Sequence, residues 1–373
     1  MNAALSSAPG ALRILHGADF HLDSPFSGLT PEQAVLRRSE QRLLLKRLAE
    51  AARTEEPHLI LLCGDLFDSR RIFRETAQTL AQALGEVSCP VFIAPGNHDF
   101  YAPDSPYAAL SWPENVHIFR SSRMESIPLP QLGCTVHGAA FTSPVRDSSP
   151  LSGFSAPQDG MLHIMALHGE MEGTGPYAPI SRDEAAASGL HYLALGHIHK
   201  ASGLQWSGGT AWAYPGCPEG RGFDETGEKG VSFVELSPHG ISSRFFPLQS
   251  RKYERLDVDL TGTQSAQQTT LAALPPNTDS DIYRIRLTGQ CPAELVQLTA
   301  LHRALSPRFF SLELQDHTQL PRELWRRAEE DNLTGLFLRE VSRRLAAAPE
   351  DENLALALRF GLAALEHGED IAP

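Results

Sequence analysis

The chain has 373 residues, 42% of them hydrophobic and 21% charged, and a net charge of −13. This length predicts more than one domain. The acidic net charge argues against a surface coated with basic residues that would bind nucleic acid. Metal ions can nevertheless bring positive charge into an acidic site. The five cysteines are odd in number and scattered, which excludes a disulfide scaffold or a zinc ribbon. With no basic, apolar leader pattern at the N-terminus and no apolar run of membrane length, we expect a cytoplasmic protein without a signal peptide or a membrane partner.

Five short apolar runs, each typical of a buried strand, are followed at once by a polar motif. In chain order, 12–15 precedes Asp19-Phe-His21, 59–63 precedes GDLFD at 64–68, 91–94 precedes GNHD at 96–99, 162–167 precedes HGE at 168–170, and 192–195 precedes GHIH at 196–199. Helical stretches at 31–53 and 71–85 separate the first three runs. This succession of strand, helix and strand predicts an α/β fold with parallel strands.

The second half of the chain has a different pattern. A Pro/Ser/Gly loop at 143–160 and further strands within 204–249 lead to a candidate domain boundary at 247–251. Period-2 strand patterns at 253–260 and 282–287, separated by a polar loop, predict a small α+β unit. Apolar residues at helical spacing predict two short helices between 334 and 373. We therefore expect three parts, at 1–250, 251–330 and 331–373.

The five motifs predict a metal centre. Loops that follow the carboxyl ends of parallel strands meet at one edge of a sheet, so these motifs should bring their polar side chains together. The set is Asp19, His21, Asp65, Asn97, His98, His168, His197 and His199. Carboxylate, imidazole and amide donors suit Mn²⁺, Fe or Zn²⁺, and their number suits two ions roughly 3.5–4 Å apart. Any one motif could be a turn or a structural histidine; the occurrence of all five, each after an apolar run, favours the metal centre. Among the histidines outside the motifs, we expect structural or surface roles for His16, His58, His117, His137, His163 and His191.

These motifs, over roughly residues 12–200, resemble the calcineurin-like metallophosphoesterases. ADFHLDSPFSGL at 18–29 and SPY at 105–107 are similar to the DNA-exonuclease branch of that superfamily, the SbcD-type and YhaO-like bacterial enzymes. The resemblance implies an α/β (α+β) fold, a four-layer calcineurin-like sandwich with a small C-terminal capping region and terminal helices. The three parts would then be a nuclease domain at 1–250, a capping domain at 251–330 and partner-binding helices at 331–373.

The resemblance also implies a role for each site residue. Asp19, His21 and His199 would hold one metal ion, Asn97, His168 and His197 would hold the other, and Asp65 would bridge them. His98 would be the catalytic histidine, and Asp68 would orient it or stabilise its charge. Two divalent ions, Mn²⁺ first and Fe or Zn²⁺ as alternatives, would neutralise a phosphodiester and lower the pKa of a water molecule, while a general acid such as His98 protonates the leaving alkoxide.

The expected function is a two-metal DNA exonuclease or endonuclease of the SbcD type that acts in DNA repair. Arg70, Arg71 and Arg74 would contact the nucleic-acid backbone, with Arg37, Arg38 and Arg42 extending the track; a solvated helix face is the alternative. The competing functions are a phosphomonoesterase, a protein phosphatase, a small-nucleotide phosphodiesterase and a non-catalytic scaffold. Protein phosphatases of this superfamily typically carry Arg-Gly directly after the second Asp of the GD motif, and Ser69 at this place disfavours a protein phosphatase.

Relatives in the SbcD branch act with a large coiled-coil ATPase, and the resemblance implies an SbcC-like partner here. The corresponding helices would lie within 331–366. In the segment 333–345 one face carries Leu333, Leu336, Phe337, Val341 and Leu345. Such a face must be covered by the protein's own domain, by a second copy of the chain in a homodimer, or by the ATPase.

Overall fold

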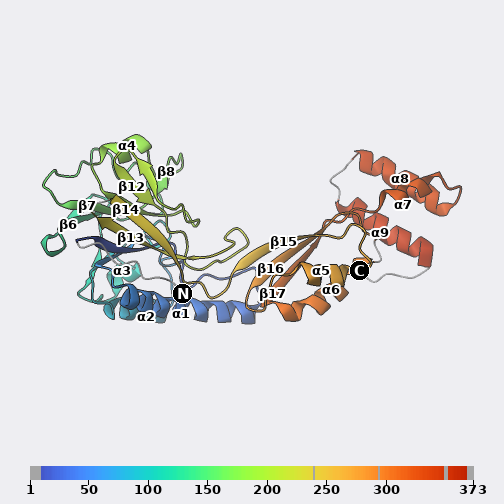
Figure 1. Ribbon diagram of the computed structural model, residues 1–373, viewed down its shortest axis with the longest axis horizontal. Helices are drawn as coiled ribbons and strands as arrows, with labels where there is room; N and C mark the ends of the chain where they lie inside the picture. The colour runs from blue at the N-terminus through green and yellow to red at the C-terminus, as the bar shows by residue number, and fades with distance from the viewer. Residues whose placement is uncertain (1–9, 238–239, 293–294, 348–351, 368–373) are drawn as a thin grey trace. The chain divides into compact units, whose positions relative to one another are not determined.

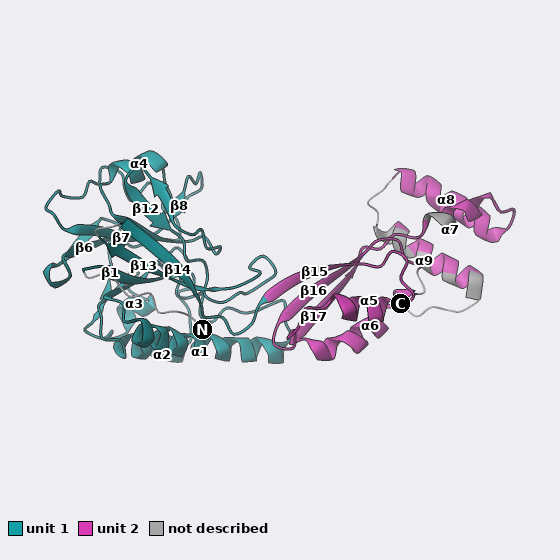
Figure 2. Cartoon of the chain, viewed as in Figure 1, with its two compact units in different colours: residues 1–252 teal, residues 253–373 magenta. Residues whose placement is uncertain are grey.

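The computed structural model describes residues 10–237, 240–292, 295–347 and 352–367. The chain divides into two compact units, Met1–Lys252 and Tyr253–Pro373 (Figure 2). The expectation about a leader falls on residues that lie partly outside the described ranges. Within those ranges, no helix combines the length and the apolar character needed to cross a bilayer.

The first sheet of unit 1 contains the strands that precede the first three motifs. Its strand order is β14-β13-β1-β2-β3-β4. The bounds are β1 Leu12–Gly17, β2 Leu59–Leu62, β3 Val91–Ile93, β4 Val116–Ile118, β13 Gly230–Ser237 and β14 Gly240–Pro247. β1 to β4 are parallel, because α1 (Pro31–Glu55) and α2 (Arg74–Gly85) carry the chain back between the first three of them, whereas β13 pairs antiparallel with β1.

The second sheet contains the strands that precede the last two motifs. Its order is β11-β12-β10-β7-β6-β5. The bounds are β5 Glu125–Leu129, β6 Cys134–Gly138, β7 Leu162–His168, β10 Tyr192–Gly196, β11 Gln205–Ser207 and β12 Thr210–Ala213. The four central strands β12, β10, β7 and β6 are parallel. Shorter elements are α3 (Pro106–Ala109), α4 (Arg182–Ala187), and the pair β8 (Glu170–Met171) and β9 (Pro179–Ile180).

Unit 1 is a four-layer structure because the central strands are apolar on both faces (Figure 1). In β2, Ile60 and Leu62 pack with α1 and α2, whereas Leu59 and Leu61 pack against the second sheet. The outer face of the second sheet packs against residues of α4 and neighbouring loops, in a separate core that includes Ala185. Continuous apolar runs are typical of parallel strands buried on both sides. This arrangement of helices, sheet, sheet and helix confirms the predicted fold class.

Unit 2 contains a three-stranded parallel sheet of β15 (Tyr253–Asp259), β16 (Ile282–Thr288) and β17 (Ser311–Asp316). The prediction of a polar loop between the first two strands was wrong in part, because this segment contains α5 (Ala266–Ala273). The Ser265 hydroxyl caps the first turn of that helix. Parallel strands require a crossover connection, and α5 and α6 (Leu298–Leu305) provide the two that this sheet needs.

The C-terminal helices of unit 2 share a small core of their own. It lies among α7 (Arg322–Arg326), α8 (Leu333–Ala347) and α9 (Glu352–His367), and its buried residues are Leu338, Val341, Leu358 and Leu362. The predicted apolar face of α8 is thus covered in part, since Val341 lies in this core. Leu333 and Leu336 are 65% and 58% exposed, because α8 is covered along the stripe that contains Leu338 instead.

Candidate metal centre

The motif loops converge at the carboxyl edges of the two sheets. The loop after β1 is joined to the loop after β2 by backbone hydrogen bonds from Asp19 N to Gly64 O (3.0 Å) and from His21 N to Asp65 O (2.9 Å). Asp19, His21, Asp65 and His197 all adopt positive φ angles, of 56°, 43°, 50° and 109°. Such backbone conformations cost of order 1–3 kcal/mol each and cluster at functional sites.

The glycine that precedes a motif residue lets neighbouring loops approach closely. At Gly96 an added Cβ would overlap the carboxylate and backbone of Asp65, and at Gly196 it would overlap the backbone carbonyl of Cys63. The GN and GH motifs therefore need glycine for contact between loops, and not for a turn alone.

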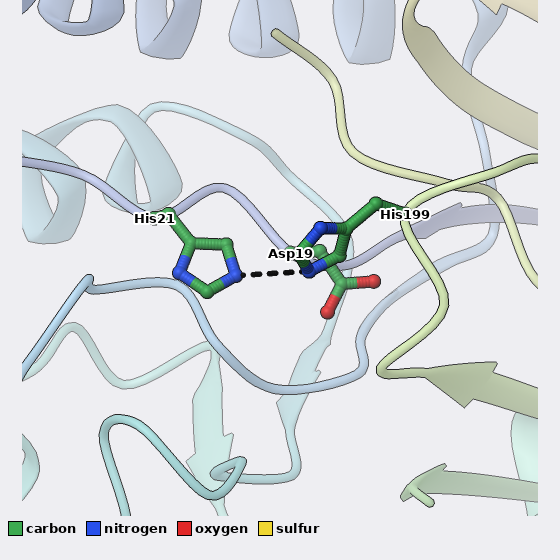
Figure 3. A group of neighbouring side chains, drawn as sticks. All are labelled: Asp19, His21 and His199. Atoms are coloured by element: carbon green, nitrogen blue, oxygen red, sulfur yellow. Dashed lines mark hydrogen bonds between the residues drawn. The ribbon is translucent and has the colours of Figure 1, made fainter. Parts of the chain in front are cut away.

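Asp19, His21 and His199 form the first ligand group (Figure 3). The Nε2 atoms of the two imidazoles lie 3.2 Å apart. Their other ring nitrogens face carboxylates: His199 Nδ1 lies 2.7 Å from Glu225 Oε1, and His21 Nδ1 lies 3.2 Å from Asp68 Oδ1. A carboxylate at Nδ1 favours the proton there, so that the Nε2 lone pairs of both rings are directed at each other.

Asp65, His168 and Asn97 form the second group. His168 Nδ1 donates to the Cys63 carbonyl (2.9 Å), and its Nε2 lies 2.9 Å from Asn97 Oδ1 and 3.4 Å from Asp65 Oδ2. The same Asp65 oxygen lies 3.7 Å from His21 Nε2, so this carboxylate lies between the two groups. The ring of His197 is 5.2 Å from that of His168, and its backbone N–H donates to Asp19.

The electrostatics of this centre fit divalent cations. Burial, together with Asp65, raises the pKa of Asp19 to about 6. Burial alone would lower the pKa of His168, but Asp65 and Asp19 outweigh it and raise that pKa to about 9. His168 in turn holds the pKa of Asp65 well below its usual range, despite burial. Buried carboxylates that attract positive charge, with imidazole lone pairs beside them, are a set that two divalent ions would satisfy.

The two cysteines near the centre keep the ligand set free of thiolate. Burial raises the pKa of both Cys63 and Cys217. Their thiols donate to the backbone carbonyls of Ala194 and His199. The candidate ligand groups among the described residues consist of Asp and His, and these offer oxygen and nitrogen donors.

The predicted catalytic pair, His98 and Asp68, lies beside these groups. The His98 ring is exposed, with its centroid 4.9 Å from that of His21. Its Nδ1 donates to the backbone carbonyl of Asp68 (3.1 Å). The Asp68 carboxylate instead accepts from Ser24 and Arg221 and faces His21. Any orienting contact to His98 thus comes from the backbone of Asp68 and not from its side chain.

Three residues that support the site were not predicted from the sequence. Asp99, fully buried, accepts hydrogen bonds from the backbone N–H groups of Gly96 (2.8 Å) and Leu66 (2.7 Å) and from the Tyr107 hydroxyl, and so ties two motif loops together. Burial, with Asp65 nearby, raises its pKa to about 6. Its position as the last residue of the GNHD motif is the sequence feature that could have identified it. Arg221 and Glu225 follow GHIH by more than 20 residues, and no local pattern marks them.

The predicted DNA-contacting arginines have different surroundings. Arg70 is partly buried, stacks over Phe100 at 4.4 Å and bonds to Asp104 (2.8 Å), whereas Arg71 and Arg74 are exposed. The expected extension through Arg37 was wrong. Its side chain is fully buried and pairs with Glu219 and Glu40 at 2.6 Å each.

A four-layer fold with this set of ligands defines a phosphoesterase of the calcineurin-like type. The chain belongs to that family, since the calcineurin-like phosphoesterase model matches residues 12–201, and it is accordingly a hydrolase of a family that uses divalent metal ions. It is 31% identical over 306 residues to the uncharacterized metallophosphoesterase YhaO of Bacillus subtilis, covering 77% of this chain and 74% of the relative. It is 25% identical over 272 residues to the DNA double-strand break repair protein Mre11 of Aeropyrum pernix, covering 66% and 64%. The predicted membership of the family, with its YhaO-like members, is confirmed.

Proposed function

We propose that this protein is a two-metal DNA nuclease of the SbcD type, an exonuclease that acts in DNA repair. The observation that carries the proposal is the exposed imidazole of His98 beside two ligand groups that are largely buried and share Asp65. The similarity to a protein named for double-strand break repair supports DNA as the substrate.

The geometry supports hydrolysis of a phosphodiester by in-line displacement. Bound at the two ligand groups, divalent ions would neutralise the phosphate and activate the attacking water. As the bond from phosphorus to the leaving oxygen breaks, a protonated His98 supplies the proton that the departing alkoxide needs. Because Nδ1 is engaged by the Asp68 carbonyl, Nε2 is the nitrogen that gives up this proton. The donor set of nitrogen and oxygen favours Mn²⁺, with Fe or Zn²⁺ as alternatives.

The segment after the GDLFD motif is the proposed contact for the DNA backbone. Arg70, Arg71 and Arg74 lie there together with Phe73, whose side chain is 64% exposed. This segment is tied to the first motif loop, because Asp23 accepts hydrogen bonds from the Phe73 N–H (2.9 Å) and from the Thr76 hydroxyl (2.8 Å). Arginines with an exposed aromatic ring are suited to phosphates and unpaired bases.

The proposed partner is an SbcC-like coiled-coil ATPase in the cytoplasm, bound through α8. The exposed Leu333 and Leu336 support this contact. Truncation near residue 330 would also uncover Leu324 and Trp325, which pack on the helical core, so point variants are the sharper test. Leu333→Asp with Leu336→Asp should abolish capture of the ATPase subunit while metal binding stays normal; undiminished capture would contradict the contact.

Nuclease assays test the proposed function directly. We expect Mn²⁺-dependent degradation of linear duplex DNA, and loss of that activity in a chelator. p-Nitrophenyl phosphate and bis-p-nitrophenyl phosphate, assayed in parallel, separate monoesterase from diesterase activity. Turnover of the monoester with intact DNA would favour a phosphomonoesterase, and inactivity on all substrates with two ions bound would favour a scaffold.

A further inference from the structure

Arg221 joins two carboxylates beside the metal centre. It lies in the connection between β12 and β13, and its side chain is 18% exposed. Its Nη2 donates to Glu225 Oε1 (2.7 Å), its Nε donates to Glu225 Oε2 (3.3 Å), and its Nη1 donates to Asp68 Oδ1 (3.2 Å). One guanidinium therefore holds Glu225 and Asp68 in a fixed relation, which its planar fork of donors makes possible.

Each of these carboxylates faces a histidine of the first ligand group. Glu225 lies at His199 Nδ1 and Asp68 lies at His21 Nδ1, and the opposite nitrogens of the two rings lie 3.2 Å apart. The contacts thus form a closed ring through His199, Glu225, Arg221, Asp68 and His21. The second group differs, because His168 is held by the backbone carbonyl of Cys63.

We infer that Arg221 and Glu225 are positioning residues that set the affinity of one metal position, formed by Asp19, His21 and His199, and leave the other unaffected. This inference rests on the two-metal site of the proposed function, but not on the identity of the substrate. Without the guanidinium, two like charges would face each other across the ring and the imidazoles would lose their fixed spacing.

A different role for Arg221 would be direct contact with the substrate phosphate. The guanidinium already makes hydrogen bonds to two carboxylates, and its Nη2 also lies 3.1 Å from His199 Nδ1. A phosphate contact would affect KM and leave metal binding unchanged, whereas a positioning role affects metal binding with no substrate present. Metal binding to the full-length chain therefore separates the two roles.

The test is a Mn²⁺ titration of the variants Glu225→Gln, Arg221→Gln and Arg221→Lys. Calorimetry measures the affinity for each ion, and electron paramagnetic resonance detects the coupled signal of the Mn²⁺ pair. Arg182→Gln is the matched control, because it breaks the exposed ion pair with Glu172 in the same unit. We expect the Glu225 and Arg221 variants to bind one ion normally and the other about 10- to 100-fold more weakly, with loss of the coupled signal of the pair. Arg221→Lys should behave like Arg221→Gln, since an ammonium group lacks the fork that spans both carboxylates.

Three results would overturn the inference. They are normal affinity for both ions in Glu225→Gln, normal affinity in Arg221→Lys, or equal weakening at both positions in a natively folded variant. If Glu225→Gln does not fold, the Arg221 variants decide, because that side chain is partly exposed. A wild-type chain that binds only one ion would overturn the two-metal site itself, whereas an inactive chain that binds two ions would overturn only the proposed function.

Discussion

At the scale of single residues, His98 differs from every other histidine of the centre in being exposed. We expect His98→Ala to bind both ions and to lose about 10²–10⁴-fold in kcat, because in the proposed mechanism it removes a general acid and no metal ligand. Asp65→Ala should instead lose metal, since its carboxylate lies between both ligand groups. Metal analysis together with single-turnover kinetics checks both variants; loss of metal from His98→Ala would assign the residue to the ligand set.

His16 predicts how stability depends on pH. Burial lowers its pKa from 6.5 to about 3; the neutral ring accepts from the Tyr192 hydroxyl (2.8 Å) and donates to the Leu195 carbonyl (3.2 Å). Below pH 6.5 the unfolded chain binds a proton that the folded chain excludes, so this stabilisation is complete above pH 6.5 and is lost as the pH falls toward 3. The loss is about 1.4 kcal/mol for each pH unit.

Urea unfolding of the metal-free protein at pH 7 and pH 5 measures this dependence. His16→Gln keeps groups that can accept from Tyr192 and donate to Leu195 but does not titrate, so its stability should fall by about 2 kcal/mol less than that of the wild type between these pH values. His137→Gln makes the same substitution at a second histidine whose pKa is lowered by burial, to about 4, and serves as a comparison for His16→Gln. An identical pH dependence in His16→Gln and wild type would contradict the prediction.

At the scale of elements, the segment before α2 is expected to contact DNA phosphates. The double variant Arg70→Ala/Arg71→Ala should bind all sequences more weakly, and the slope of log K against log salt should be shallower by about two. Arg343→Ala/Arg344→Ala is the control with the same change in net charge, since both arginines pair with Glu340 on α8. Equal slopes in the two double variants would show that Arg70 and Arg71 do not contact phosphates.

Elements with a strong local pattern could be predicted from the sequence. β2 is recognisable because its four residues are apolar and buried on both faces, and the GDLFD motif begins two residues after its end. The sequence could not show which stripe of α8 is covered, because that depends on α9: both Leu336 and Leu338 fit a helical pattern, but only Leu338 is buried. α5 was missed since its Gln- and Thr-rich sequence lacks a wide apolar face, and the need for a crossover between parallel strands marks it only once β15 and β16 are known to pair.

The same distinction applies to the candidate site. Its motif residues lie at the ends of strands or within a few residues of them, so the parallel order of the sheets brings them together without further information. Arg221 and Glu225 reach the histidines from a long irregular connection, whose path depends on tertiary contacts. One of these is the buried pair of Arg37 and Glu219, which fixes the start of that connection against α1. Sequence periodicity carries no signal for such contacts.

At the scale of the whole molecule, the two units have separate hydrophobic cores, and the metal centre belongs to unit 1 alone. We therefore expect two transitions in calorimetric unfolding of the full-length protein. Mn²⁺ should raise the midpoint temperature of only one transition. An ion that binds the folded site stabilises the unit that contains it, by about 2.7 kcal/mol at an ion concentration 100 times its Kd.

Core variants assign each transition to its unit. Ile285→Ala removes a fully buried side chain of the unit 2 core and should cost about 2–5 kcal/mol, lowering the transition that Mn²⁺ leaves unchanged. Leu61→Ala, in the core between the sheets of unit 1, should lower the transition that Mn²⁺ raises. A single transition that both variants and the metal shift together would mean that the units unfold cooperatively, and metal binding in unit 1 would then stabilise unit 2 as well.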